Sequence, residues 1–255
     1  MIDSSNISPG IIAITMAGEG SRFILAGFNE PKYKIQVQNK TLFEWSLSSL
    51  TSFRDNNWKF IFVVQKQHNA EKFIRKICKR MNFKIEEIIC ISEKTDGQAS
   101  TAKIVADKYA TDVSFGIFNI DTYISNQSLR HHDIPFEKDG WIPCFNGKGD
   151  MWSFVKVDNN LFAREVREKK RISNNASIGF YWFKSTKQYI EYYKKHFNKN
   201  GLENKERYIA PIYNSLIEDK KKITIKNLPE RDVHILGTPE QVNYFDKYLE
   251  NKYAN

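Results

Sequence analysis

Apolar residues form short, near-continuous runs in the first half of the chain, and helical patterns separate these runs. We predict strands at 11–17, 59–65, 85–92 and 114–121, and helices at 41–52, 69–82 and 98–110. Near-continuous apolar strands that alternate with helices are typical of a parallel sheet covered on both faces. The pattern therefore predicts an α/β fold with a mostly parallel mixed sheet flanked by helices.

After about residue 140 the pattern changes to shorter strands joined by polar turns. We predict strands at 141–146, 151–157, 162–168, 176–183 and 223–227, and helices at 186–197, 205–219 and 239–252. Linkers, repeats and low-complexity blocks do not interrupt the sequence. We therefore expect a single domain over 1–255, with one half at about 1–135 and a second half at about 136–255.

Composition narrows the class of protein. Of the 255 residues, 41% are apolar and 14% are aromatic, which argues against a disordered chain. The sequence shows neither a run of 18 apolar residues nor a charged-then-apolar leader, so we expect no membrane span and no secretion signal. Its three scattered cysteines, Cys78, Cys90 and Cys144, suit a reducing compartment. These features together predict a cytoplasmic protein.

The net charge of +9, from 39 basic and 30 acidic residues, allows several anionic partners. A basic surface can bind nucleic acid, acidic lipid or phosphorylated small molecules. The basic residues are spread along the chain, and no nucleic-acid-binding motif accompanies them. We therefore expect neither a nucleic-acid nor a membrane partner, and a nucleic-acid-binding module is the lesser alternative.

A glycine-bearing turn follows the first predicted strand, at Gly18-Glu19-Gly20-Ser21-Arg22-Phe23. Such a turn exposes backbone N–H groups that can cradle a polyphosphate, and Arg22 and Lys32 add positive charge beside it. It differs from the Walker loop, because no Gly-Lys-Ser/Thr follows, and from the dinucleotide fingerprint, because Phe23 replaces the third glycine. A triphosphate site and an ordinary turn are the two interpretations that the spacing leaves open.

Candidate binding residues come at the ends of the predicted parallel strands. They are Gly18 to Arg22, Gln65, Gly97 and Asp121. In open α/β sheets the ligand crevice lies at the carboxyl ends of the strands. We therefore expect these residues to converge on one site.

In order and spacing these motifs resemble those of the sugar nucleotidyltransferase family. The matching segments cover most of the chain: Met16 to Phe23, Glu30-Pro31-Lys32, Gly97-Gln98-Ala99, Asn119-Ile120-Asp121, Glu168-Lys169 and Ser177-Ile178-Gly179. The resemblance implies a Rossmann-like, GT-A-like fold. Ala26-Gly27-Phe28 and Leu236-Gly237-Thr238-Pro239-Glu240 are similar to segments of a branch found among bacterial capsule-biosynthesis enzymes. Within that branch the chain is similar to cytidylyltransferases, including the type that acts on CTP and phosphoglutamine.

The family's reaction implies roles for the residues of the first half. An acceptor phosphate oxygen attacks the α-phosphorus of a nucleoside triphosphate and pyrophosphate leaves, so positioning and charge neutralisation supply most of the rate. Arg22 would steady the pyrophosphate, and Lys32, rather than Lys34, would neutralise charge at the α-phosphate. The nucleotide-binding residues implied are Ala17, Gly18, Gly20, Ser21, Gln65, Gly97 and Gln98. Gly97 and Gln98 match positions against the base, which leaves cytosine and uracil open, and Gln65 is the weaker candidate.

The resemblance also implies a Mg²⁺ ion. Asp121 ends a buried strand, where an unpartnered carboxylate is costly, so the family's metal-binding role suits it. A capping role in a turn is the alternative. Ile235 stands where the family has a second aspartate, and Asp232 is the substitute that we expect at the metal, with His234 as the other neighbour.

An acceptor site is implied for the second half. Lys169 matches the family lysine that binds the acceptor's phosphate, Glu168 would orient it, and Gly179 belongs to the same acceptor-binding set. The charged run at 167–171 also suits an ordinary solvated surface. Residues 208–214 are a further candidate for the acceptor pocket, although Pro211 in the first turn of a helix explains that segment equally well.

The function that these implications favour is a Mg²⁺-dependent nucleotidyltransferase. It would transfer CMP from CTP to a small phosphorylated metabolite in capsular or surface-glycan biosynthesis, including activation of phosphoglutamine. Alternatives are a sugar-1-phosphate uridylyl- or guanylyltransferase and a non-catalytic nucleotide-binding relative. A homo-oligomer is compatible with each of these functions.

Overall fold

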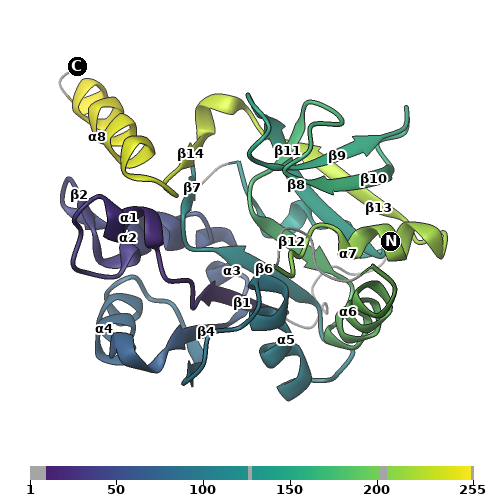
Figure 1. Cartoon of the computed structure of the whole chain (residues 1–255), viewed down its shortest axis with the longest axis horizontal. Coiled ribbons are helices and arrows are strands. Elements are labelled where there is room, and N and C mark those ends of the chain that lie inside the picture. Colours follow the sequence, from purple (N-terminus) through teal and green to yellow (C-terminus); the bar gives the residue numbers. More distant parts are fainter. Residues whose placement is uncertain (1–9, 126–127, 201–205, 254–255) are drawn as a thin grey trace.

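A mixed sheet of ten strands runs through the centre of the molecule (Figure 1). The computed structural model describes residues 10–125, 128–200 and 206–253. The strands lie across the sheet in the order β10 (Ala163–Glu168), β9 (Ser153–Val157), β11 (Asn175–Ser177), β8 (Gly140–Asn146), β12 (Phe180–Phe183), β6 (Phe115–Asn119), β1 (Ile11–Met16), β4 (Lys59–Gln65) and β5 (Ile85–Ile91), and β13 (Ile223–Asn227) pairs with β8.

The N-terminal part of this sheet is parallel. β1 lies between β4 and β6, and β5 extends the sheet beyond β4. Because these four strands run in the same direction, their carboxyl ends meet at one edge. That edge is where the sequence predicted the site.

The C-terminal part of the sheet is largely antiparallel. β12 pairs antiparallel with both β6 and β8, and β11, β9 and β10 continue in the same way, whereas β13 runs parallel to β8. The predicted fold class, an α/β mixed sheet flanked by helices, is confirmed. The reversal at β12 brings the second half of the chain beside the carboxyl ends of the first.

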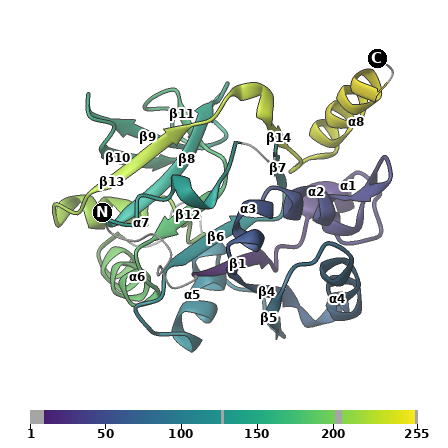
Figure 2. The ribbon, with the colours of Figure 1, turned by 180° about the vertical axis from the view of Figure 1, so that it is seen from behind.

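Helices cover both faces of the sheet, as Figure 2 shows from behind. They are α2 (Leu42–Ser48), α3 (Thr51–Asp55) and α4 (Glu71–Arg80) on one face, and α5 (Gln98–Lys108), α6 (Thr186–Asn200) and α7 (Ile212–Glu218) on the other. Successive strand residues point to opposite faces. Ile12 and Ile14 therefore join the first core, and Ile11 and Ala13 the second. None of the described helices is long and apolar enough to cross a lipid bilayer.

Helix α2 begins where the sequence predicts. The Thr41 hydroxyl accepts from the Glu44 N–H at 3.3 Å, and the Glu44 carboxylate accepts from the Thr41 N–H at 2.9 Å, which completes a capping box. The predicted helix at 41–52 is nevertheless two helices. Leu50, with φ −100° and ψ 14°, departs from helical geometry and separates α2 from α3.

The predicted strand at 176–183 is also interrupted. β11 ends at Ser177 and β12 begins at Phe180, because Gly179 adopts φ +83°. A Cβ built at Gly179 would lie 2.3 Å from Asn119 Nδ2. Glycine thus permits both the bend and the close approach to the end of β6.

The predicted helix at 205–219 starts later than expected. Residue 205 lies outside the described residues, and α7 begins at Ile212 with Pro211 as its N-cap. Arg207 is held by the start of α5, since its N–H donates to the Asp96 carbonyl at 2.7 Å and its carbonyl accepts from the Ala99 N–H at 3.0 Å. These long-range bonds override the local helical pattern.

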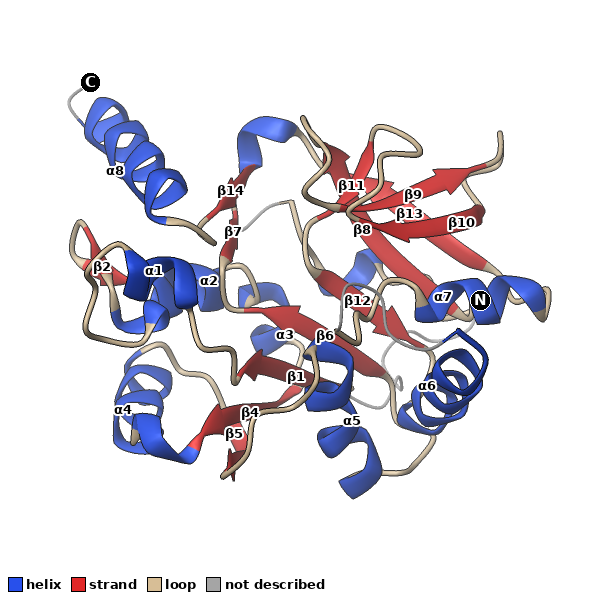
Figure 3. Cartoon of the chain, in the orientation of Figure 1, coloured by secondary structure: helices blue, strands red, loops and turns tan. Residues whose placement is uncertain are grey.

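Short elements that the sequence pattern did not predict surround the sheet. They are α1 (Ser21–Leu25), η2 (Lys32–Lys34), β2 (Gln36–Val37), β3 (Lys40–Thr41), η3 (Lys66–His68), β7 (Thr122–Ile124), η4 (His131–Asp133), η5 (Glu230–Asp232) and β14 (Val233–Ile235). β7 and β14 form a small antiparallel pair, and the terminal helix α8 (Pro239–Tyr253) follows it (Figure 3). A third apolar cluster, which includes Phe23, Trp45 and Phe245, joins α8 to α1 and α2. The C-terminal segment thereby returns to the first half.

Candidate functional site

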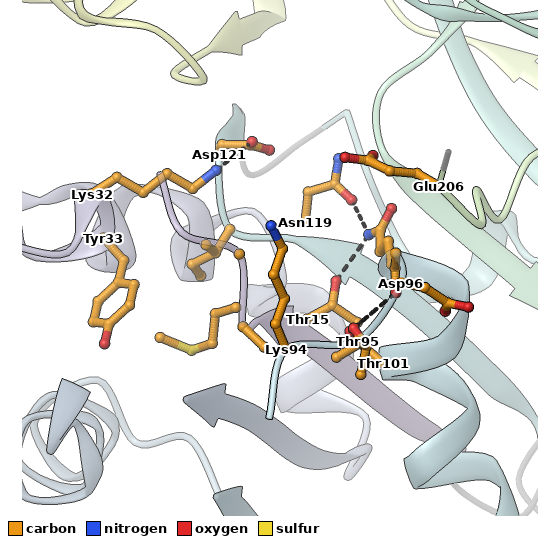
Figure 4. A pocket seen from close by; sticks show the side chains of 16 residues that line it. Thr15, Lys32, Tyr33, Lys94, Thr95, Asp96, Thr101, Asn119, Asp121 and Glu206 are labelled. Carbon is orange, nitrogen blue, oxygen red and sulfur yellow. Dashed lines mark hydrogen bonds and ion pairs between the residues drawn. The ribbon is translucent and has the colours of Figure 1, made fainter. Parts of the chain in front are cut away.

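A cavity of about 530 Å³ opens at the carboxyl edge of the parallel strands (Figure 4). It is lined by residues 15–18 at the end of β1, residues 94–98 at the start of α5 and residues 119–121 at the end of β6. Lys32 from η2 also lines it, and Glu206 enters from the second half of the chain. We call this the first cavity, and almost all of its lining comes from the N-terminal half.

A second cavity of about 300 Å³ shares part of its lining with the first. Most of its residues come from the second half, at 151–153, 177–179 and 208–209, with further contributions from Gly237 and Thr238. Antiparallel strands and the segment before α8 therefore build this second cavity.

Three side chains line both cavities: Gln98, Asn119 and Asp121. They mark the junction of the two cavities. A ligand in the first cavity and a ligand in the second would meet beside these residues.

The charges at this junction are those of Lys32 and Asp121. Lys32 Nζ lies 2.7 Å from Asp121 Oδ2, and both side chains are mostly buried, with exposures of 21% and 27%. Burial opposes ionisation of Asp121, but the Lys32 ammonium, with a smaller contribution from Arg22, holds the pKa of that carboxyl below its usual range. Arg22 itself lines the second cavity. The two predicted catalytic residues thus both reach the junction region.

The turn after β1 carries the predicted phosphate loop. Ala17 and Gly18 line the first cavity, whereas Gly20 and Ser21 lie where α1 begins. Gly20 adopts φ +68°, and a Cβ built there would contact the Lys32 side chain at 3.6 Å. Gly20 therefore shapes a left-handed turn that lets the loop pass beside the lysine.

Gly97 occupies a crowded position at the start of α5. It adopts φ +143°, and a Cβ there would lie 2.4 Å from the carbonyl oxygen of Arg207. Any side chain would displace the segment that carries Glu206 and Tyr208. Gly97 lines the first cavity, as a base-contacting position must, and the contact itself stays a prediction.

The two glutamines that we predicted at the nucleotide use their amides within the protein. Gln65 is 5% exposed, and its Nε2 donates to the Ala17 carbonyl at 2.6 Å, so it supports the loop from behind rather than lining either cavity. Gln98 lines both cavities, but its Nε2 donates to Thr15 Oγ1 at 2.9 Å and to Asn119 Oδ1. For a ligand, Gln98 keeps only its carboxamide oxygen.

The predicted acceptor residues gather around the second cavity. Glu168 and Gly179 line it, and the Glu168 carboxylate accepts a hydrogen bond from Ser153 Oγ. Lys169 Nζ donates to the Tyr208 hydroxyl at 2.8 Å and lies 4.8 Å from the centroid of that ring. Because Tyr208 lines the cavity, Lys169 reaches the cavity wall through it.

The structure separates the two predicted metal ligands. Strand β14 pairs with β7 so that Ile235 lies opposite Thr122, next to Asp121, whereas the Asp232 carbonyl accepts from the Ser125 N–H. The Asp232 carboxylate accepts from Ser128 Oγ. Within the described residues there is no group of three or more His, Cys, Asp or Glu side chains that could hold a metal ion. Asp121, at the junction, stays the predicted ligand, and Asp232 lines neither cavity.

His234, the other neighbour of the missing aspartate, belongs to a packing cluster. Its ring stacks on Tyr123 with centroids 5.5 Å apart, and it lies 4.7 Å from the ring of Tyr248. Burial lowers the pKa of His234 to about 4. A neutral ring held between aromatic neighbours indicates a structural role.

Sequence analysis missed several residues that line the first cavity. Asn119 was part of a recognised motif without a role of its own, and Thr15 lay unnoticed inside an apolar strand. Lys94 Nζ pairs with Glu19 Oε1 at 3.1 Å, which connects the loop before α5 to the glycine turn. Glu206 comes from far along the chain. A polar residue among the last positions of a buried strand was the signal that could have found Thr15 and Asn119.

Comparisons with known proteins identify a family and similar folds. Residues 12–226 match the family model for nucleotidyl transferases. The chain is similar to the nucleoside-diphosphate-sugar pyrophosphorylase from Vibrio cholerae RC9, with 31% identity, a TM-score of 0.85 and coverage of 92% of this chain and 99% of that one. No curated protein matches the chain.

More distant structures share the fold. The inositol-1-phosphate CTP transferase from T. maritima has 12% identity and a TM-score of 0.72, and the alignment covers 91% of each chain. A Bacillus anthracis protein to which glucose-1-phosphate thymidylyltransferase activity is ascribed has 14% identity and a TM-score of 0.73, with coverage of 93% and 94%. At these identities the likeness concerns the backbone arrangement.

Proposed function

The chain belongs to the nucleotidyl transferase family, and from that premise we propose that it transfers a nucleoside monophosphate to a small phosphorylated acceptor with release of pyrophosphate. The observation that carries this proposal is the meeting of two cavities at the Lys32–Asp121 pair. In this proposal, the triphosphate occupies the first cavity and the acceptor occupies the second. The α-phosphorus then lies at the junction, within reach of an acceptor phosphate oxygen.

The side chains at the junction suit phosphoryl transfer. Positioning and electrostatic stabilisation carry this chemistry, because no covalent enzyme intermediate is required. Lys32 neutralises charge on the α-phosphate, and Arg22 steadies the pyrophosphate as it leaves. Ala17 and Gly18 let the backbone approach the triphosphate. The half at about 1–135 thus binds the nucleotide, and the half at about 136–255 binds the acceptor.

Mg²⁺ is part of this proposal. The ion usually takes one or two carboxylates together with substrate phosphates and waters, so a single carboxylate at the junction is a sufficient protein contribution. Asp121 provides that carboxylate, and its lowered pKa keeps it ionised at neutral pH. When bound, the ion would neutralise phosphate charge. The Lys32 ammonium would then turn from Asp121 to the substrate phosphate.

CTP is our preferred donor, and we propose a role in capsular or surface-glycan biosynthesis, including activation of phosphoglutamine. The support is the sequence likeness of the segments at 20–23, 26–28 and 236–240 to those of that branch, within which the chain is similar to cytidylyltransferases. A second candidate is a sugar-1-phosphate uridylyl- or guanylyltransferase. The Vibrio relative, named for nucleoside-diphosphate sugars, favours a sugar 1-phosphate as the acceptor.

A pyrophosphate-release screen tests the proposal. The protein is incubated with Mg²⁺ and each of CTP, UTP, GTP, ATP and dTTP, against glucose 1-phosphate, other sugar 1-phosphates and phosphorylated glutamine. We expect release with one donor and one acceptor class. CTP with phosphorylated glutamine supports the first candidate, and UTP or GTP with a sugar 1-phosphate supports the second.

Calorimetry with each nucleotide separates a failed enzyme from a failed site. Tight nucleotide binding without turnover on any pair would indicate a non-catalytic relative. Neither binding nor turnover, from a folded sample, would contradict the proposal altogether.

A further inference from the structure

We propose that Asn119 is a catalytic residue whose amide N–H groups donate to a phosphate oxygen at the junction, and that Gln98 is the positioning residue that fixes this orientation. The inference rests on the proposed function and deepens it. It starts from the place of both side chains, which line the first and the second cavity together. Figure 4 shows Thr15 and Asn119 at this wall, with dashed lines for the hydrogen bonds that Gln98 donates to them.

The orientation of Gln98 follows from its neighbour Thr15. The Thr15 hydroxyl has one hydrogen, which it donates to the Phe118 carbonyl at 3.4 Å. Its oxygen must therefore accept from Gln98, which lies 2.9 Å away. This bond requires the amide nitrogen of Gln98, rather than its oxygen, to face Thr15.

The orientation of Asn119 follows in turn from Gln98. The same Nε2 group has a second hydrogen, and Asn119 Oδ1 accepts it. Because the Asn119 oxygen faces Gln98, its Nδ2 must point away from Gln98. The side-chain amide thus has one direction, set by hydrogen bonds that begin at the backbone of β6.

The nitrogen of Asn119 faces the edge of the second cavity. A Cβ at Gly179 would lie 2.3 Å from it, so Nδ2 passes directly over the bare backbone of Gly179, which lines that cavity. The Asn119 N–H also donates to the Gly179 carbonyl at 3.2 Å, which fixes the two residues together. No described residue accepts a hydrogen bond from Nδ2. Its two N–H groups are therefore available to a ligand.

Donors of this kind fit the charge that develops in the proposed reaction. The acceptor oxygen forms a bond to the α-phosphorus, the bond between that phosphorus and the oxygen bridging to the β-phosphate breaks, and the electron pair leaves with pyrophosphate. Negative charge meanwhile sits on the other oxygens at the α-phosphorus. Neutral donors that are oriented in advance stabilise such charge without reorganisation. Asn119 supplies such donors in the cavity that Lys32 and Asp121 also line.

The test uses near-isosteric apolar variants and the donor–acceptor pair that turns over in the wild type. Asn119→Leu removes both donors, and we expect kcat to fall about 10²-fold, the scale of one lost oxyanion donor. The dissociation constant for the nucleotide of that pair, measured by calorimetry, should change less than about threefold, because we expect the donors to fit the α-phosphate oxygens best when the fifth oxygen approaches phosphorus in the transition state. Gln98→Met leaves Asn119 free to rotate, and kcat should fall about tenfold.

The double variant tests whether Gln98 acts through Asn119. Asn119→Leu/Gln98→Met should be no slower than Asn119→Leu alone, and multiplied losses would overturn the positioning role. Gln188→Met on α6, outside both cavities, is the matched control and should keep wild-type kcat.

Three other outcomes overturn the inference. Wild-type kcat in Asn119→Leu would remove Asn119 from the mechanism while leaving the proposed function intact. A parallel loss of kcat, CTP affinity and thermal midpoint would assign Asn119 a structural role only. A folded wild type without turnover on any pair would overturn the proposed function and this inference with it.

Discussion

The two cavities differ in how the chain builds them. The first takes almost all of its lining from the ends of parallel strands and the loops that follow them, within residues 15–121. The second combines strand ends from the antiparallel part with the segments around Tyr208 and Thr238, and takes Arg22 from the first half. The proposed nucleotide side therefore follows from the order of the strands along the chain, whereas the proposed acceptor side is assembled from distant segments.

This difference decides how each side can vary. Parallel strands place their loops at one edge whatever the loops contain, so the first cavity follows from the sheet. The second cavity depends on pairings such as β12 with β6 and on the return of the C-terminal segment to the first half. If the proposed roles hold, we expect changes in the second half to alter the acceptor without disturbing the nucleotide. Substitutions on each side test whether the two can be separated in this way.

The largest expected effect is on the nucleotide side, at Lys32. In Lys32→Ala the ammonium that lies 2.7 Å from Asp121 is lost, together with the charge proposed to act on the α-phosphate. We expect kcat to fall at least ~10²-fold, the scale of one electrostatic stabiliser, in the pyrophosphate-release assay. The matched control is Lys34→Ala in the same short helix, since Lys34 lies over the ring of Phe73 instead. Equal losses in both variants would mean that the site depends on general charge rather than on Lys32.

A second prediction concerns the core beneath the acceptor side. His196 on α6 is 3% exposed, and burial lowers its pKa to about 4. In the unfolded chain His196 is protonated below pH ~6.5, whereas in the folded protein it stays neutral until about pH 4. The free energy of unfolding therefore falls as the pH falls through this window. At pH 5 this group alone should lower the free energy of unfolding by about 2 kcal/mol relative to pH 7.5, because a tenfold difference in proton affinity between the two states corresponds to ~1.4 kcal/mol.

Urea unfolding at the two pH values measures this loss. His196→Gln removes the titrating group and should flatten the difference between pH 7.5 and pH 5. An unchanged difference in that variant would show that a group other than His196 causes the acid sensitivity.

The third prediction separates the acceptor side from the nucleotide side. Lys169 Nζ holds the Tyr208 hydroxyl at 2.8 Å on the wall of the second cavity. In Lys169→Met we expect the acceptor KM to rise about tenfold, which corresponds to ~1.4 kcal/mol, while the nucleotide KM stays within about twofold. Lys170→Met, the next residue of the same charged run, is the control and should leave both constants unchanged. A rise in the nucleotide KM for Lys169→Met would show that the two sides are coupled.

The same contrast explains how much of the site the sequence could predict. Gly18, Gly97 and Asp121 were found because each follows a recognisable strand or opens a recognisable helix, and the parallel fold then brings them together. Asp232 was wrongly expected beside Asp121, since the register of β14 against β7 places Ile235 there, and short antiparallel pairs leave little pattern in a sequence. The partner of Gln65 could not be predicted either, because its bond to the Ala17 carbonyl depends on tertiary contact.

The fold shows the same division. The bounds of strands β1, β4 and β6 were predicted closely, because continuous apolar runs that end in turns mark where each strand begins and ends. The expected helix at 205–219 failed at its start, where backbone bonds to Asp96 and Ala99 hold Arg207 against α5. Local propensity has no information about such a partner, which lies about a hundred residues earlier in the chain. Long-range backbone pairing is thus what sequence reasoning missed in both the fold and the site.

The smallest expected effect lies at the mouth of the first cavity, where Lys94 Nζ pairs with Glu19 Oε1 at 3.1 Å. Both side chains are about half exposed, with 57% and 50% accessibility, so the pair itself contributes at most ~1 kcal/mol to stability. A triphosphate in the glycine turn would attract Lys94 and repel Glu19. We therefore expect Lys94→Met to raise the nucleotide KM about threefold and Glu19→Gln to lower it by a similar factor, with the acceptor KM unchanged.

The control is Lys103→Met on α5, because the Lys103 ammonium pairs with Asp107. Salt at 0.5 M should shrink both shifts, because screening weakens exposed charges. Shifts in the acceptor KM, or shifts of the same sign in both variants, would contradict a local electrostatic effect confined to the nucleotide side.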